Sequence, residues 1–277
     1  KKGLDLGVNF VDTAEIYGQG LSEKLVGEAI RERRDDVVIA TKVSPWHLRY
    51  GGVIKAANRS LERLGVSTID LYQIHFPNPV FPIKNTMRAM EKLVTDGKVR
   101  HIGVSNFGVK KLREAQEATK SNEIVSNQVK YNMVERSIEK ELLEYSKSSN
   151  VTILAYSPLA QGVLVGRQPS SMIQSANILF APQNLKQLEP LLETLRDIAV
   201  KRGKTMAQVA LNWLLKDEIV ILIPGIKKVK HVEDNIGAAD WRLTQNELER
   251  IEKAFGSFKK EKRWSYPRML LRLLLRR

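Results

Sequence analysis

Ionisable residues close several apolar runs of this chain. Asp12, Lys42 and His75 each stand at the end of such a run, and Tyr17 follows Asp12 by five positions. A phenol is a weak acid with an ordinary pKa of about 10. A nearby ammonium group stabilises the phenolate, so we expect Lys42 to lower the pKa of Tyr17, with Asp12 holding the lysine charged and in place.

This set of side chains predicts a proton-transfer site. His75 can hydrogen-bond a substrate oxygen and orient it toward Tyr17, which then donates a proton to an oxygen that gains negative charge. Hydride addition to a carbonyl is the natural partner reaction. Each residue also has an ordinary alternative role: Asp12 as a helix N-cap, Lys42 as a solvated charge and His75 as a core histidine. Their succession along the chain favours an active site.

The apolar runs that carry these residues predict seven strands. Each run is short and rich in Val and Ile, as strands buried on both faces are. They span residues 8–13, 37–43, 69–75, 99–106, 124–132, 151–159 and 219–226. Apolar spacing of three and four predicts helices between and after them. The helices span residues 21–32, 53–64, 83–94, 109–119, 138–146, 185–200, 206–215 and 248–255.

Alternating strands and helices indicate βαβ units and a parallel sheet. A doubly wound sheet is disfavoured, because its Gly-rich phosphate loop has only a weak counterpart at residues 18–23. We therefore predict an α/β fold, a (β/α)8 TIM barrel whose first βα unit is largely missing from this sequence. Residues 1–7 read as the end of a helix. The predicted domains are a barrel over residues 1–257 and a basic tail over residues 258–277.

The amino-acid composition and net charge exclude several kinds of site and partner. The 277 residues include no cysteine, which excludes disulfides and iron–sulfur clusters, and the four histidines show no metal-ligand spacing, so no metal is expected. The net charge is +14, and half of it lies in the tail, where eight basic residues face one acidic residue. We expect no nucleic-acid partner and no transmembrane segment, although Arg268, Arg272 and Arg276 could share one face of a membrane-surface helix. With no signal peptide at the start, a cytoplasmic location is expected.

The motifs together resemble the aldo-keto reductase superfamily, in its prokaryotic branch related to potassium-channel beta subunits. The resemblance covers roughly residues 1–255 and rests on GVNFVDTAEIYGQGLSE, IATK, DLYQIHFP, GKVRHIGVSNF, NQVKYN, AYSPLAQGVL and VILIPGIKK. It implies a barrel that binds NADP(H) without a Rossmann fold, and a catalytic tetrad of Asp12, Tyr17, Lys42 and His75 with Tyr17 as the general acid. The oligomeric state stays open.

The resemblance also implies cofactor-binding residues. Ser105, Asn106 and Gln128 match residues that bind the nicotinamide carboxamide, and Tyr156 matches the aromatic residue that stacks on the nicotinamide ring. The match for the pyrophosphate segment comprises Ser157, Leu159, Gln161 and Gly162. The match for the adenosine 2′-phosphate and adenine comprises Gly225, Lys227, Lys228, His231, Asp234 and Asn235.

Three loop residues are candidates for the substrate pocket. Trp46 and His47 follow Lys42, and Phe76 follows His75, so they predict an apolar, aromatic pocket; ordinary loop packing is the alternative. The predicted function is NADPH-dependent reduction of aldehydes or ketones, with a small carbonyl compound as the partner. Two alternatives are an NADP(H)-sensing regulatory subunit with slow or vestigial turnover and an anion-associated protein acting through the tail.

Overall fold

The computed structural model describes residues 1–169, 177–226, 228–256 and 258–259. These residues form two compact units. Unit 1 contains Lys1–Tyr131, Ser137–Tyr156 and Glu218–Ile223, and unit 2 contains the described residues of Asn132–Arg136, Ser157–Asp217 and Pro224–Arg277. None of the described helices is long and apolar enough to cross a bilayer.

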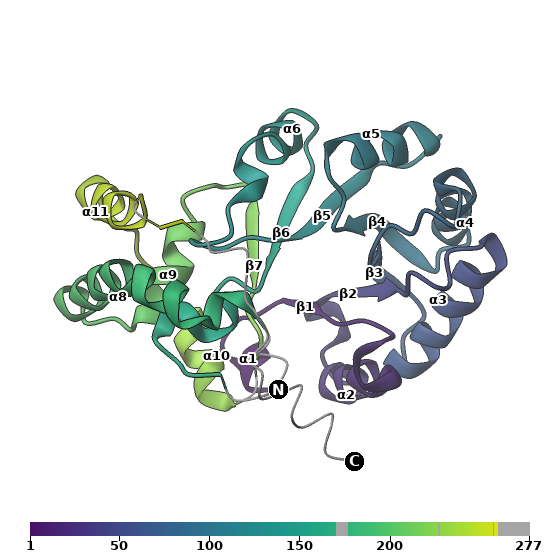
Figure 1. Ribbon diagram of the computed structural model, residues 1–277. Helices are drawn as coiled ribbons and strands as arrows, with labels where there is room; N and C mark the ends of the chain where they lie inside the picture. Colours follow the sequence, from purple (N-terminus) through teal and green to yellow (C-terminus); the bar gives the residue numbers. More distant parts are fainter. Residues whose placement is uncertain (170–176, 227, 257, 260–277) are drawn as a thin grey trace, which may run out of the picture. The chain divides into compact units, whose positions relative to one another are not determined.

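Unit 1 is built on a parallel sheet of seven strands that curls into a nearly closed barrel (Figure 1). The strands follow one another in the order of the sequence, and within the described residues β1 pairs only with β2 and β7 only with β6. They are β1 (Phe10–Asp12), β2 (Val38–Val43), β3 (Ile69–Ile74), β4 (Val99–Ser105), β5 (Ile124–Lys130), β6 (Thr152–Tyr156) and β7 (Val220–Ile223). The predicted α/β barrel is therefore confirmed, and each predicted strand is found, shortened by one to four residues.

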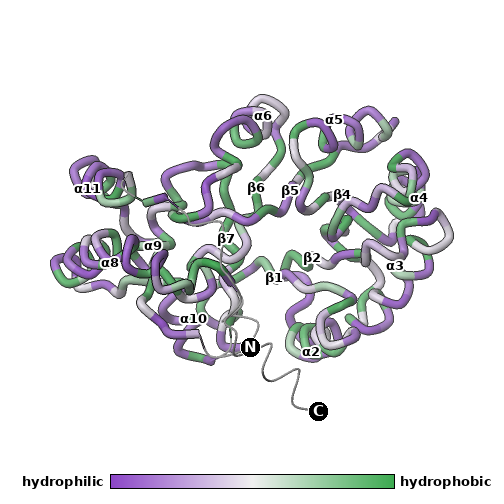
Figure 2. The backbone as a smooth tube through the Cα atoms, viewed as in Figure 1, coloured by the Kyte–Doolittle hydropathy of each residue, from purple (hydrophilic) through white to green (hydrophobic). Residues whose placement is uncertain are grey.

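Helices of unit 1 cover the outside of this sheet (Figure 1). They are α1 (Lys2–Asp5), α2 (Leu21–Ile30), α3 (Tyr50–Leu64), α4 (Ile83–Thr95), α5 (Val109–Ala118) and α6 (Leu142–Ser148). In Figure 2 they alternate between hydrophobic and hydrophilic colours along their turns, as amphipathic helices do. On α4, for example, Met87, Met90 and Leu93 are completely buried. The left-handed Gly65 ends α3.

The other α-helices of the described residues lie in unit 2. They are α8 (Pro182–Arg202), α9 (Met206–Leu214), α10 (Val229–Ile236) and α11 (Gln245–Phe255). Two of them begin with a capping box, Thr205 with Gln208 on α9 and Thr244 with Glu247 on α11. Arg136 lies over the rings of Trp213 and Phe255 in this unit.

Several helix predictions need correction. Helices α3 and α11 each begin three residues earlier than predicted, at Tyr50 and Gln245. Helix α6 begins at Leu142 and not at Ile138, because residues 137–139 form a separate 3₁₀ turn. Helix α8 begins at Pro182, since proline fits the first turn, where no backbone N–H is needed. Helix α10 was not predicted at all. The predicted division at residues 257 and 258 stays a prediction, because residues 260–277 lie outside the described residues.

Candidate active site

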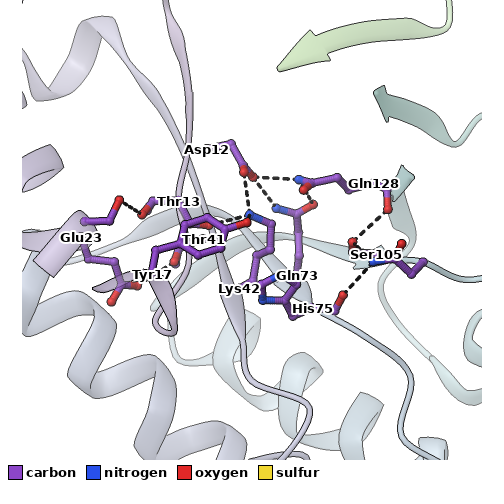
Figure 3. A network of polar contacts seen from close by, with 12 residues as sticks. Asp12, Thr13, Tyr17, Glu23, Thr41, Lys42, Gln73, His75, Ser105 and Gln128 are labelled. Carbon is purple, nitrogen blue, oxygen red and sulfur yellow. Dashed lines mark hydrogen bonds and ion pairs between the residues drawn. The ribbon is translucent and has the colours of Figure 1, made fainter. Parts of the chain in front are cut away.

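The carboxyl ends of three neighbouring strands bring Asp12, Lys42 and His75 together. Asp12 is the last residue of β1, Lys42 is the fifth residue of β2, and His75 directly follows β3. Parallel strands end at the same edge of a sheet, so their last side chains gather there. Tyr17 comes from the turn after β1, whose backbone is left-handed at Gly18 and Gln19. This turn carries the phenol back to the strand ends (Figure 3).

Lys42 is the centre of the cluster. Its side chain is completely buried, and its Nζ donates to Asp12 Oδ2 at 2.5 Å and to the carbonyl of Thr13 at 2.8 Å. The same nitrogen lies 3.5 Å from the hydroxyl oxygen of Tyr17. The ammonium group therefore bridges a carboxylate and a phenol, as the sequence predicted.

The pKa of Tyr17 contradicts the expected direction. Partial burial, followed by the charge of Asp12 and by Tyr156, raises the pKa of Tyr17 to about 12. The neighbouring Lys42 does not reverse this upward shift of the pKa. Burial also lowers the pKa of Lys42, against the opposing charges of Asp12 and Glu23. Tyr17 is thus protonated at neutral pH and available as a donor.

His75 is a neutral imidazole at neutral pH. Burial and the charge of Lys42 lower its pKa to about 4, and Glu15 opposes this only weakly. Its ring meets that of Tyr17 edge to face at 5.7 Å between centroids and stacks on Phe76 at 5.1 Å. Its buried Nδ1 has no hydrogen-bond partner. A neutral ring can donate one hydrogen bond and accept another, which suits contact with a carbonyl oxygen.

The predicted nicotinamide-binding residues of unit 1 form a second network at the same strand ends. Asn106 Nδ2 donates to Ser105 Oγ at 2.9 Å and to the carbonyl of His75 at 3.2 Å. The hydroxyl of Tyr156 donates to Asn106 Oδ1 at 3.0 Å. Gln128 Nε2 donates to Asp12 Oδ1 at 2.8 Å, so this network joins the Lys42 cluster (Figure 3).

The predicted substrate residues differ in how they relate to this cluster. Phe76 lies next to the Lys42 cluster, because its ring stacks on the ring of His75. His47 Nδ1 instead pairs with Glu15 Oε1 at 2.9 Å, and Trp46 is 74% exposed. The structure therefore brings Phe76 to the candidate site and leaves Trp46 facing solvent.

In unit 2, the predicted pyrophosphate segment has an unusual backbone. Ser157, Gln161 and Gly162 all have left-handed φ angles, of 53°, 57° and 104°. Backbone N–H groups that turn in this way form concave binding places for anions, which fits a pyrophosphate. Leu159 lies in the same segment, directly before the 3₁₀ turn of residues 160–165.

The predicted adenosine-end residues follow β7. Gly225 and Lys228 are exposed and precede α10, which carries His231, Asp234 and Asn235. The buried Nδ2 of Asn235 has no hydrogen-bond partner, so a donor is free for a ligand acceptor. These features fit a phosphorylated nucleotide. Lys227 lies outside the described residues.

Three buried polar residues of the site were missed from the sequence. Gln73 contacts Asp12, Glu15 accepts from the backbone N–H of Ser44, and Glu23 accepts from Thr41 Oγ1 at 2.6 Å. Gln73 had one signal: it lies two positions before His75, and residues two apart share a face of a strand. No group of three or more metal-binding side chains occurs in the described part of the chain.

Comparison with known proteins decides the family. Residues 1–255 match the Aldo/keto reductase family. The chain belongs to this family. It is 40% identical over 265 residues to an uncharacterized oxidoreductase of Mycobacterium tuberculosis, covering 94% of this chain and 81% of that protein. It is 33% identical over 255 residues to methylglyoxal reductase of Escherichia coli, covering 92% and 82%.

Solved structures agree with this membership. An aldo-keto reductase from Klebsiella pneumoniae in complex with NADPH has a TM-score of 0.78 and 33% identity, over 95% of this chain and 84% of that one. A glycerol dehydrogenase from Gluconobacter oxydans has a TM-score of 0.86 and 31% identity, over 95% and 86%. The chain is therefore an aldo-keto reductase, an oxidoreductase of a family that uses NADP(H).

Proposed function

We propose that this aldo-keto reductase reduces aldehydes and ketones to alcohols with NADPH, and that Tyr17 donates the proton. The contact that carries the proposal is the buried Lys42 ammonium group, which lies within reach of both the Asp12 carboxylate and the Tyr17 hydroxyl. When bound, NADPH would provide the hydride that the carbonyl carbon accepts. Tyr17 supplies the proton to the carbonyl oxygen, so the C=O group becomes an alcohol.

The charges of the cluster suit this direction of proton transfer. Although Tyr17 is a weak acid with a pKa of about 12, an alkoxide is a far stronger base than a phenolate, so the transfer is downhill. Lys42 stabilises the phenolate left behind, and the Asp12 carboxylate holds the ammonium group in place. Neutral His75 donates a hydrogen bond to the carbonyl oxygen and directs it to Tyr17.

We propose the predicted cofactor residues as the NADPH contacts. Ser105, Asn106 and Gln128 would hold the carboxamide, and Tyr156 would stack on the nicotinamide ring. Residues 157–162 would cradle the pyrophosphate, and Lys228 with the residues of α10 would hold the adenosine 2′-phosphate end. The left-handed backbone and the free Asn235 amide support these assignments.

For the substrate, we propose carbonyl compounds with an aryl group or a medium-length apolar chain. Phe76 stacks on His75 and is 42% exposed, which favours an apolar group next to the carbonyl. His47, whose ring pairs with Glu15, would border the pocket, and the exposed Trp46 would stand at its solvent edge. The methylglyoxal reductase among the relatives supports an aldehyde as one accepted substrate.

The test is steady-state oxidation of NADPH and NADH with an activated aromatic aldehyde, in wild type and in Tyr17→Phe. We expect NADPH to be preferred and kcat to fall by about 10²–10⁴-fold in the variant, because the proton donor is lost. Tyr50→Phe, on the outer helix α3, is the matched control and should keep the wild-type kcat. Tight NADPH binding with no turnover in wild type would contradict the reductase and favour an NADP(H) sensor.

A further inference from the structure

The geometry points to Gln73 as a positioning residue that holds the Asp12 carboxylate in the orientation required by Lys42. The inference rests on the proposed function and adds a residue to it. Gln73 lies on β3 and is completely buried. A buried amide side chain costs free energy unless it is hydrogen-bonded, so its partners indicate why it is there.

The hydrogen-bond partners of Gln73 are residues of the candidate site. Gln73 Nε2 donates to Asp12 Oδ1 at 3.2 Å, and Gln73 Oε1 accepts from Gln128 Nε2 at 3.3 Å. Gln128 donates to the same Asp12 oxygen at 2.8 Å. Two amides therefore occupy Oδ1, which leaves Oδ2 facing Lys42 at 2.5 Å. Figure 3 shows the two amides and the ammonium group gathered around the Asp12 carboxylate.

The sheet is shaped to place Gln73 there. In the strand register, Gln73 lies between Lys42 on β2 and Gly103 on β4. A Cβ atom on Gly103 would lie 2.9 Å from Gln73 Cγ and 2.5 Å from Ser126 Oγ, which is too close. The missing side chain at position 103 thus gives Gln73 the space to reach Asp12. The hydrogen bond from Gln73 to Asp12 thus depends on the packing of these neighbouring strands, and it fixes the orientation of the Asp12 carboxylate.

A carboxylate with one donor fewer can rotate away from Lys42. Lys42 is surrounded by Asp12 and Tyr17, by the charge of Glu23 on α2, and by the ring of His75 after β3. Asp12 is its only direct ion pair in the described residues. Loss of alignment would therefore weaken the interaction that keeps Lys42 charged, and would misplace the ammonium group relative to Tyr17.

The experiment compares Gln73→Met, which keeps the side-chain volume but cannot donate, with Ser126→Ala. Ser126 is the matched control because it is buried in the same layer and its hydroxyl has no partner. Lys42 is observed by ¹⁵Nζ NMR across a pH titration, without cofactor or substrate. In Gln73→Met the titration midpoint of Lys42 should fall by about half a pH unit or more, while Ser126→Ala should match wild type. An unchanged or higher midpoint would overturn the inference even if the protein had no reductase activity.

Kinetics give the second readout. With NADPH and an aromatic aldehyde, kcat of Gln73→Met should fall about tenfold with KM within about twofold. Gln73→Glu offers rescue, because a carboxylic acid donates to Asp12 only when it is protonated; its kcat should approach wild type as the pH falls, and that of Gln73→Met should not. Wild-type kcat in Gln73→Met would reject the inference and leave the proposed function standing.

Discussion

At the scale of single residues, burial decides the charge states of the site more than neighbouring charges do. His75 shows this most clearly, because its folded pKa of about 4 lies below its ordinary value of 6.5. Between these two pH values the unfolded chain binds a proton that the folded chain does not. His75 therefore contributes a penalty to the folded state that grows as the pH falls from about 6.5 to about 4.

This difference predicts the pH dependence of stability. Between pH 7 and pH 4.5 the free energy of unfolding should fall more in wild type than in His75→Gln. The difference between the two decreases should be on the order of 2 kcal/mol. Urea unfolding at a series of pH values measures it. The comparison uses the slope of unfolding free energy against pH and not its absolute value. The substitution also changes packing, and that change shifts the stability equally at every pH. Parallel curves would show that His75 titrates at the same pH in both states.

Residue types also limited what could be predicted from the sequence. Asp12, Lys42 and His75 were predictable because each is a polar residue at the end of an apolar run, and Tyr17 because it follows Asp12 by five positions. Gln73 was not, because it stands inside such a run and its partner Asp12 is 61 positions away. The direction of the pKa shift of Tyr17 could not be predicted either, because it depends on burial of the phenol and on how close Asp12 and Tyr156 lie to it.

At the scale of elements, close packing between helices α2 and α3 rests on one glycine. A Cβ atom on Gly27 of α2 would lie 2.3 Å from the carbonyl oxygen of Leu64 at the end of α3. The buried carboxylate of Glu23, also on α2, binds Arg63 of α3 at 2.6 Å. The distance between α2 and α3 and the ion pair between Glu23 and Arg63 therefore depend on each other.

Gly27→Ala should consequently destabilise the protein by about 1–3 kcal/mol, because the backbone must move to relieve the clash. Gly51→Ala is the control, since it is also helical and nothing lies within 4 Å of its added Cβ. That variant should stay within about 0.5 kcal/mol of wild type. Thermal and urea unfolding of the three proteins measure the difference. Equal stability of both variants would mean that the helices can separate at no cost.

Element existence was predictable and element boundaries were less so. The buried strands were recognisable as continuous Val- and Ile-rich runs, and the long helices by their spacing. Helix α10 was missed because it has eight residues and only Val232 is buried in it. The 3₁₀ turn at residues 160–165 has no sequence period, because it depends on left-handed backbone at Gln161 and Gly162.

At the scale of the whole molecule, the chain enters unit 2 in three segments, and each follows a strand of unit 1. Residues 132–136 come after β5, residues 157–217 after β6, and the segment from residue 224 after β7. The predicted cofactor residues of unit 2 lie in the second and third segments. The net charge of +14 favours the approach of an anionic dinucleotide.

Cofactor binding should therefore stabilise the whole protein. At 100 times its Kd, NADPH should add about 2.7 kcal/mol and raise Tm by about 5 °C, and NADH at the same concentration should do less. In Lys228→Met the difference between the two cofactors should shrink, because a partner of the 2′-phosphate is lost. Lys253→Met, an exposed lysine on α11, is the control and should keep the difference. If the stabilisation by NADPH exceeded that by NADH equally in Lys228→Met and Lys253→Met, Lys228 would not be a contact of the 2′-phosphate.

The packing around Gly103 also couples three positions of the barrel. A Cβ atom at position 103 would lie 2.5 Å from Ser126 Oγ and 2.9 Å from Gln73 Cγ. An alanine there therefore clashes with two side chains from two neighbouring strands, and a change at position 73 alone does not make room for it.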